Sequence, residues 1–541
     1  MKFFTRIALS LFAIFTYTAS LAQDTNTKVV VNIFVENMRN DYITRFWSHL
    51  REDGFKRFYN DGYVCSNVEM SQSVMERSSS IATLATGTWP QSHGIVSDQW
   101  YDWLNSSKVQ AVEDPYFFTV GSDSDEGKAS SKNLLVSTLS DQINKISLQK
   151  NRTYTVSLNR NTAVLASGHK SEGAYWLDNQ SGNFISSSFF LETFPEWAFL
   201  FNKKRLIDDY ASRKWEPLLP STEYSESIED DYILEKGYAQ RYNSFPHNIE
   251  NLVEKSGSFK ILKSTPFGNQ LVTDFTKQLL VSEAFGKNKT LDQLNVIFST
   301  MDKQAIHFGP TSMEMEDTFL RLDANIASLL KFMDQKYGKG NYLVSLANFN
   351  PTQYGIEYLK EELKMPVSYF DPSSATALLK SFLNIRFEKG NWILMSDNQQ
   401  IFFDRELIRK RKLDISTFQK ETALFLKDFE AVAQAWSAST LLQTDFTSKV
   451  NAPFSHGFNA KRSGDVVYKL KSDWAVKDRY SSPSYYGEKQ GMFLFLGNGV
   501  QRALDPKQYN TIDLVPTISY LLSIPSPSSC SGKAIIPVKR D

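Results

Sequence analysis

The chain has 541 residues, which fits one large domain with insertions, or two domains, better than one simple compact core. Hydrophobic residues make up 41% of the sequence and aromatic residues 13%, enough for a substantial core, so global disorder is excluded. Lys and Arg total 60, as do Asp and Glu, and this balance argues against binding to nucleic acid or to an anionic membrane surface.

The first 22 residues have the pattern of a secretory signal peptide. Lys2 and Arg6 precede an apolar run at 7–15, and Ser20 and Ala22 form a small-x-small cleavage site. No later apolar run reaches the length of about 18 residues that a membrane span needs. We therefore expect a protein without a transmembrane segment, exported to the periplasm or secreted, with a mature chain of residues 23–541.

Cysteine occurs only at Cys65 and Cys530. In an oxidising compartment these residues could form a disulfide that ties an early segment to the C-terminus. Two separate buried thiols are an equally good interpretation, and the sequence leaves both open.

Apolar runs alternate with amphipathic stretches along much of the chain. The run KVVVNIFV at 28–35 is rich in β-branched residues and predicts a buried parallel strand. Further strands are expected at 154–158, 293–300, 342–347 and 492–496, and helices at 41–50, 133–145, 312–333 and 511–522. Residues 174–283 and 351–472 lack this alternation, and we interpret them as insertions. The sequence thus predicts an α/β fold.

The stretch 71–103 holds a loop and a helix start. Residues 78–86 have the small side chains of a tightly packed helix, and Gly87 is a plausible helix end. A helix that follows a strand and a loop is where α/β enzymes place a nucleophile, close to the helix N-terminus. Arg77 and Ser78 stand at this helix start.

Several motifs in one order resemble the alkaline phosphatase superfamily. They are VENMR at 35–39, ATGTWPQSHGI at 85–95, SLNRNTAVLASGH at 157–169, HFGPTSMEMEDTFLRLD at 307–323, KRSGDV at 461–466 and DLVPTISYLLSIPSP at 513–527. The chain is most similar to the bacterial periplasmic alkaline phosphatases related to nucleotide pyrophosphatases and phosphodiesterases. The resemblance runs from 28 to 537. It implies a three-layer sandwich with a mostly parallel central sheet and inserted cap regions.

Members of that superfamily use two zinc ions and a Thr or Ser nucleophile, but the corresponding positions differ here. The nucleophile position holds Arg77, and the phosphate-binding positions hold Asp98, Asn159 and Asn161. The metal-ligand positions hold Glu36, Asp302, Ile306, Asn348, Phe349 and Gln490, of which only Asp302 is unchanged. Ile and Phe side chains cannot coordinate a metal. We therefore expect no zinc, no other cofactor and no catalytic residue of the family type.

A permanently charged guanidinium at the nucleophile position suggests a replacement for the lost positive charge. Arginine binds carboxylates in bidentate fashion. We predict that the Arg77 head group lies within salt-bridge distance of Glu36 or Asp302.

These residues favour an exported pseudoenzyme that binds an envelope protein or a glycan, or acts as a scaffold, without two-metal phosphatase activity. The alternative is an atypical hydrolase of phosphate or sulfate esters, a phosphatase or phosphodiesterase, with a site built from Ser78, Glu36, Asp98, Asp302 and His307. A third interpretation is a ligand sensor that uses the same cleft without catalysis.

Overall fold

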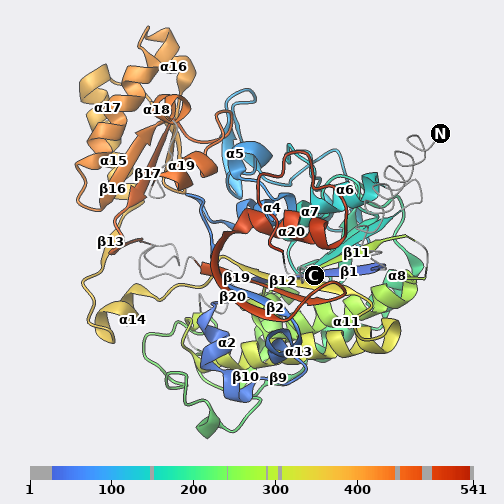
Figure 1. The fold of residues 1–541 in the computed structure, drawn as a ribbon. Coiled ribbons are helices and arrows are strands. Elements are labelled where there is room, and N and C mark those ends of the chain that lie inside the picture. Colours follow the sequence, from blue (N-terminus) through green and yellow to red (C-terminus); the bar gives the residue numbers. More distant parts are fainter. Residues whose placement is uncertain are drawn as a thin grey trace, which may run out of the picture.

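A ten-stranded sheet lies at the centre of the computed structural model, which describes residues 27–146, 151–239, 242–287, 290–301, 307–444, 451–477 and 490–536. The strand order is β20-β2-β19-β12-β1-β11-β6-β7-β8-β5 (Figure 1). In chain order these strands are β1 (Val29–Glu36), β2 (Tyr63–Glu69), β5 (Thr119–Val120), β6 (Arg152–Ser157), β7 (Gly173–Leu177), β8 (Phe184–Ser187), β11 (Asp292–Phe298), β12 (Leu343–Phe349), β19 (Gln490–Gly497) and β20 (Ala503–Asn510). The central neighbours are parallel, while β19, β8 and β5 pair in antiparallel fashion. The predicted signal peptide at 1–22 lies outside the described residues.

Strand β1 confirms the buried parallel strand predicted at 28–35. All eight of its residues are buried, and it pairs in parallel with β11 on one side and β12 on the other. Its single interior polar residue, Asn32, donates to Asn295 of β11 and accepts from Ser345 of β12. These bonds satisfy the buried amide, and they join the three strands whose carboxyl ends form the edge where open α/β sheets bind ligands.

Helices cover both faces of the sheet and give three layers (Figure 1). One face packs against α2 (Asp41–Arg45), α3 (Phe55–Asp61), α11 (Pro266–Ser282) and α13 (Met313–Tyr337). The other packs against α4 (Arg77–Thr86), α6 (Leu139–Lys145), α7 (Arg160–Ser167) and α20 (Leu514–Leu521). None of the helices in these described segments has the length and apolar character to cross a membrane.

Two predicted helices are shorter than the sequence pattern indicated. The helix expected at 133–145 begins only at Leu139, because the Thr138 hydroxyl accepts from the Asp141 N–H and caps the helix there. The helix expected at 41–50 ends at Arg45, and a 3₁₀ turn follows at Trp47–His49.

The region 174–283 contributes more to the central sheet than an insertion would. It contains most of β7, all of β8 and helix α11, which packs on the sheet. Its periphery consists of α8 (Glu196–Lys203), α9 (Leu206–Ala211), α10 (Ile249–Ser256) and a short pair of strands, β9 (Lys214–Trp215) and β10 (His247–Asn248). The strands of this region are short, rich in aromatic residues and paired with one another in antiparallel fashion, so their sequence shows no alternation of strands and helices, and the region was interpreted as an insertion.

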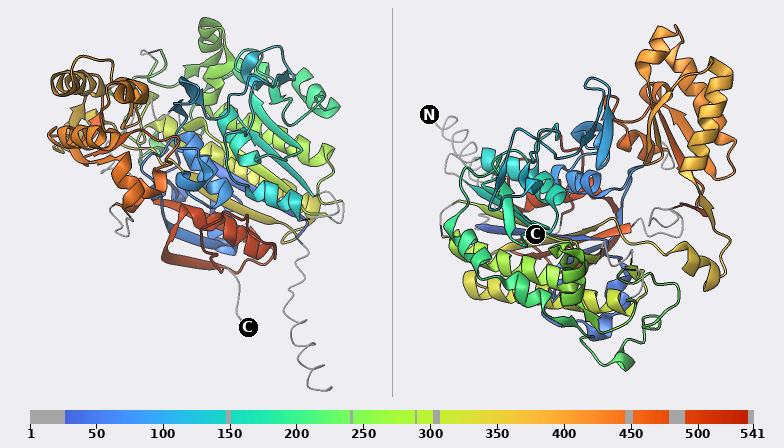
Figure 2. Two further views of the ribbon diagram at one scale, coloured as in Figure 1. Left: turned by 90° about the horizontal axis from the view of Figure 1, so that it is seen from above. Right: turned by 180° about the vertical axis from the view of Figure 1, so that it is seen from behind.

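Much of the region 351–472 forms a subdomain with its own core, beside the main sheet (Figures 1 and 2). Its sheet has the order β14-β15-β17-β16, formed by β14 (Ile393–Asp397), β15 (Gln400–Phe403), β16 (Val432–Ser437) and β17 (Val466–Leu470). Its helices are α15 (Pro372–Phe387), α16 (Arg405–Lys410), α17 (Ile415–Lys427) and α18 (Ala438–Gln443). We call this the cap subdomain.

Short elements join these parts. They are α5 (Pro90–His93), the hairpin β3 (Gln99–Asp102) and β4 (Ser107–Gln110), α14 (Ile356–Glu361), α19 (Ala452–Gly457), and the pair β13 (Ser368–Phe370) and β18 (Trp474–Val476).

Candidate functional site

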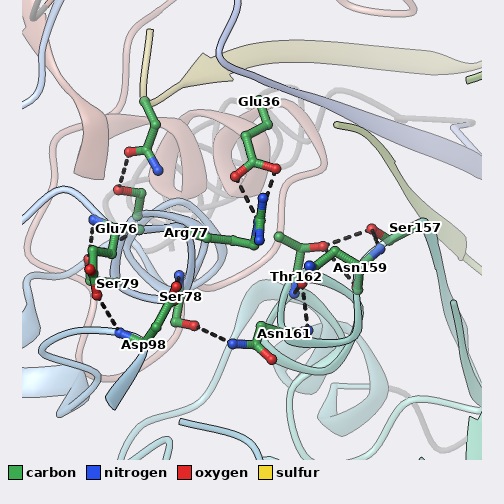
Figure 3. Close-up of polar contacts among 12 residues, drawn as sticks. Glu36, Glu76, Arg77, Ser78, Ser79, Asp98, Ser157, Asn159, Asn161 and Thr162 are labelled. Atoms are coloured by element: carbon green, nitrogen blue, oxygen red, sulfur yellow. Dashed lines mark hydrogen bonds and ion pairs between the residues drawn. The ribbon is translucent and has the colours of Figure 1, made fainter. Parts of the chain in front are cut away.

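An ion pair joins the end of β1 to the start of α4. Arg77 Nε donates to both carboxylate oxygens of Glu36, at 2.8 and 3.1 Å (Figure 3). The Glu36 side chain is 2% exposed and the Arg77 side chain 19%. The predicted contact between these residues is therefore confirmed. Asp302, the other partner considered, lies outside the described residues.

Helix α4 begins at Arg77 because a capping box forms just before it. The Glu76 carboxylate accepts the backbone N–H of Ser79, and the Ser79 hydroxyl accepts the backbone N–H of Glu76. Asp98 adds a second carboxylate, since its Oδ1 accepts the Ser78 N–H at 2.8 Å. Its own N–H donates to Glu76 Oε2 at 2.8 Å. Two anions at a helix N-terminus are favoured by the helix dipole.

Ser78 connects this helix start to a second one. Asn161 Nδ2 donates to Ser78 Oγ at 2.9 Å, and Asn161 lies in the first turn of α7 (Figure 3). Asn159 caps α7, where its side chain accepts from the N–H groups of Asn161 and Thr162. The structure thus brings together Ser78 and all three residues at the predicted phosphate-binding positions. The Ser78 side chain itself is fully buried.

The residues at the metal-ligand positions do not fit a two-zinc centre. Asn348 Nδ2 donates to the Met38 carbonyl and to Asn40 Oδ1, and Asn348 Oδ1 accepts the Met492 N–H. Both polar atoms of this amide are therefore used in hydrogen bonds within the protein. Phe349 is a buried hydrocarbon, and Gln490 is exposed at the start of β19. The described part of the chain contains no group of three or more His, Cys, Asp and Glu side chains placed to hold a metal. Asp302 and Ile306 lie outside it.

His307 is directed toward a loop of the peripheral region. Its Nδ1 lies 3.1 Å from the Gly237 carbonyl oxygen, and its ring packs on Tyr238. The hydrogen bonds of Ser78 therefore involve Asp98 and Asn161, whereas this bond of His307 involves the 237 loop.

A buried acid–histidine pair near the start of α13 was missed by the sequence analysis. His247 Nε2 lies 2.7 Å from Glu314 Oε1, and both side chains are fully buried. Burial raises the pKa of Glu314 and lowers that of His247 to about 4, so burial favours the neutral form of each group. Burial also raises the pKa of nearby Glu235 to about 10, with a contribution from Glu314. The acidic motif 314–317 was the only signal, and it resembles an exposed helix turn.

The two cysteines are free thiols in the structure. Cys65 is buried in β2, and Cys530 is half-buried near Gly87. Burial raises the pKa of both thiols.

Known proteins resemble this chain over almost its whole length. A family model described as type I phosphodiesterase/nucleotide pyrophosphatase matches residues 30–493. The alkaline phosphatase PhoV of Synechococcus elongatus is 31% identical over 521 residues, covering 94% of this chain and 92% of PhoV. The alkaline phosphatase PafA of Elizabethkingia meningoseptica is 30% identical over 529 residues, covering 96% of each chain. The crystal structure of wild-type PafA matches with a TM-score of 0.89 at 29% identity, covering 95% of this chain and 99% of that one.

The crystal structure confirms the predicted alkaline-phosphatase-like α/β fold. The prediction of a binding or scaffolding protein without phosphatase activity is wrong, because relatives that match end to end are alkaline phosphatases. That prediction inferred a loss of activity from the replaced nucleophile, phosphate-binding and metal-ligand positions, although guanidinium groups, amides and helix N-termini also bind phosphoryl groups. The comparisons favour the alternative, an ester hydrolase. The chain belongs to the type I phosphodiesterase/nucleotide pyrophosphatase family.

Proposed function

We propose that the protein hydrolyses phosphate esters, as a phosphatase or phosphodiesterase, at the carboxyl end of β1. The observation that carries this proposal is the end-to-end similarity to the alkaline phosphatases PhoV and PafA. The location supports it, because ligands of open α/β sheets bind at the carboxyl ends of the strands.

The chain's own groups offer hydrogen-bond donors and one cation to the phosphoryl group, beside the carboxylates of Glu36, Glu76 and Asp98. Arg77 supplies a permanent charge, and its guanidinium suits the geometry of phosphate oxygens. The N-termini of α4 and α7 meet at the Ser78–Asn161 hydrogen bond and add their dipoles. The Asn161 amide is a further donor at this point. Since the described residues do not fit a two-zinc centre, these groups bind and orient the phosphoryl group in the proposal.

Ser78 is the nucleophile in this proposal. Its hydroxyl stands next to the position where family members carry theirs, and Asn161 fixes its orientation. The Asp98 carboxylate, held against the Ser78 backbone, accepts the hydroxyl proton. Attack by the Ser78 hydroxyl forms a phosphoserine and releases the alcohol, and water then hydrolyses the phosphoserine to inorganic phosphate. Because Ser78 is buried, the proposal requires both the ester and this water to reach it from the side of Arg77, whose side chain is partly exposed.

The test is hydrolysis of p-nitrophenyl phosphate and its bis-ester by the purified mature chain. Ser78→Ala should lower kcat/KM by at least about 100-fold, the usual scale for loss of a nucleophile. Ser80→Ala is the matched control, because Ser80 is a buried serine in the same helix turn whose hydroxyl donates to Asn350. It should retain activity within a few-fold. Turnover that is equal in wild type and Ser78→Ala would overturn the assignment of the nucleophile, and no turnover of either ester would overturn the function.

The pattern at residues 1–22 supports a location outside the cytoplasm for this activity. Intact-mass measurement of the protein from its native host should show cleavage after Ala22. A retained Met1 would contradict export by this route.

A further inference from the structure

A cavity of about 340 Å³ lies between the loop that leads into α4 and the cap subdomain. Its polar lining comes from Ser73 and Glu76 on the loop and from Ser396, Asp397, Asn398, Gln399 and Tyr468 on the cap subdomain. The volume lies within the range of roughly 300–1,000 Å³ found for small-molecule sites. Glu76 immediately precedes Arg77, so the cavity borders the helix start at which the phosphoryl group is proposed to bind.

The cap subdomain contributes a strained hairpin tip to this cavity. Asp397 pairs with Gln400 across the turn between β14 and β15, which leaves Asn398 and Gln399 as its two central residues. Both have positive φ, 49° and 57°. Glycine adopts this conformation without steric strain, whereas a glutamine at this position lowers the stability of the folded protein. Strain of this kind concentrates at binding and catalytic sites.

The hairpin tip is anchored despite its strain. Gln99 Nε2 donates to Asp397 Oδ2 at 3.1 Å, and the Tyr468 N–H donates to the Gln399 carbonyl at 2.9 Å. The first bond ties the tip to the segment just after Asp98. The polar groups of the tip are therefore held in a defined position relative to the start of α4, as a binding site requires.

The charges of the cavity select the ligand class. The described lining includes two carboxylates and no Lys, Arg or His, which disfavours a second phosphate, a polyphosphate or a carboxylate. Glu76 is engaged by the Ser79 and Asp98 N–H groups, and Asp397 by the Gln99 amide. The remaining polar lining consists of amides and hydroxyls, which match a neutral partner that both donates and accepts hydrogen bonds.

We propose that this cavity binds a neutral polyhydroxylated group, a sugar or a polyol, as the alcohol half of the ester substrate. This inference rests on the proposed function for its catalytic meaning, but the binding itself does not require turnover. In this proposal, residues 397–399 of the cap subdomain select which phosphate esters the site accepts.

The test replaces the hairpin tip by Asn398→Gly/Gln399→Gly, which removes both side chains while keeping the positive φ angles. Lys412→Gly is the matched control, because Lys412 also has positive φ, at 55°, and is exposed elsewhere on the cap subdomain. We expect the ratio of kcat/KM for α-D-glucose 1-phosphate to that for p-nitrophenyl phosphate to fall about tenfold in the double variant, the effect of one or two lost hydrogen bonds. The control should keep the wild-type ratio. An unchanged ratio in the double variant, or an equal fall in the control, would overturn the proposal.

A binding measurement separates this proposal from the catalytic one. Saturation-transfer NMR with methyl α-D-glucoside should show contact with the wild type and loss of contact in the double variant, whether or not any ester is hydrolysed. Absence of contact with the wild type would overturn the sugar site. A selective loss of kcat/KM for phosphoethanolamine in the double variant would also overturn it, since this would identify a cationic alcohol as the ligand.

Discussion

The Glu36–Arg77 ion pair should contribute measurably to stability, and a double-mutant cycle can isolate its contribution. The substitutions are Glu36→Gln, Arg77→Met and the two combined. Gln keeps the size of the Glu36 side chain and removes its charge, and Met keeps much of the arginine stem. Each single variant leaves the other charge without its partner in a mostly buried place.

The expected magnitude follows from burial and distance. Two unit charges about 4 Å apart attract by about 4 kcal/mol at an effective dielectric constant of about 20. Loss of one partner of a buried pair typically costs about 3–5 kcal/mol. Because the Arg77 side chain is 19% exposed, water partly replaces its lost partner. We therefore expect each single variant to lose about 2–3 kcal/mol, and the coupling energy to be at least about 1.5 kcal/mol.

The assay is urea unfolding at pH 7, followed by tryptophan fluorescence. An Arg386→Met/Glu421→Gln cycle is the control, since these residues also form two charged hydrogen bonds, at 2.6 and 2.8 Å, but with an exposed arginine. It should show no measurable coupling, as is usual for surface pairs. A coupling energy for Glu36 and Arg77 no larger than that of the control would refute the argument that burial gives this pair its strength.

Three further predictions follow from the surroundings of the site. Asp98→Asn should tighten inhibition by inorganic phosphate about tenfold, because it removes an anion from the binding position. It should also lower kcat, because the proton acceptor is lost. Weaker inhibition by phosphate would contradict this charge argument. Burial raises the pKa of Glu235 to about 10, so its carboxyl keeps its proton in the folded state, whereas the unfolded chain releases this proton above about pH 4. The free energy of unfolding therefore falls as the pH rises from about 4 to about 10. The urea midpoint of Glu235→Gln should therefore exceed that of wild type by more at pH 9 than at pH 5, and an equal difference at both would exclude this titration. In a Cys530→Ser variant, which removes the half-buried second thiol, Cys65 is buried with a raised pKa and should react with a thiol reagent at pH 7 only after unfolding. A colorimetric thiol titration would show this, and reaction in the native state would contradict the burial of Cys65.

Much of the centre of the fold could be predicted because its signals are local. A continuous β-branched run identified β1, and the small residues after Arg77 with a glycine at 87 identified α4. The ion pair was also predictable, although its residues are 41 positions apart, because motif positions placed both at one strand end. The sequence pattern was informative wherever the residues of one helix or strand were sufficient to indicate its burial or its end.

Other features depend on contacts that no local pattern records. The buried pair of Glu314 and His247 joins residues 67 positions apart, and acidic side chains at a helix start usually face water. The sequence shows that Asn348 stands at a metal-ligand position of the family, but its three hydrogen bonds to the 38–40 turn and to Met492 depend on the order of the strands. The hairpin tip at 398–399 lacks the Asn-Gly sequence that normally marks such a turn.

The activity could not be inferred from the identity of single residues, because the register of α4 decides which side chain faces which partner. Successive helical residues point about 100° apart, since a turn takes 3.6 residues. The capping box at Glu76 fixes this register, so that Arg77 points to Glu36 and Ser78 to Asn161. A shift of the cap by one residue would rotate these directions by about 100° and separate both pairs. The cap therefore controls two contacts at once, and a substitution that weakens it should impair the ion pair and the orientation of the serine hydroxyl together.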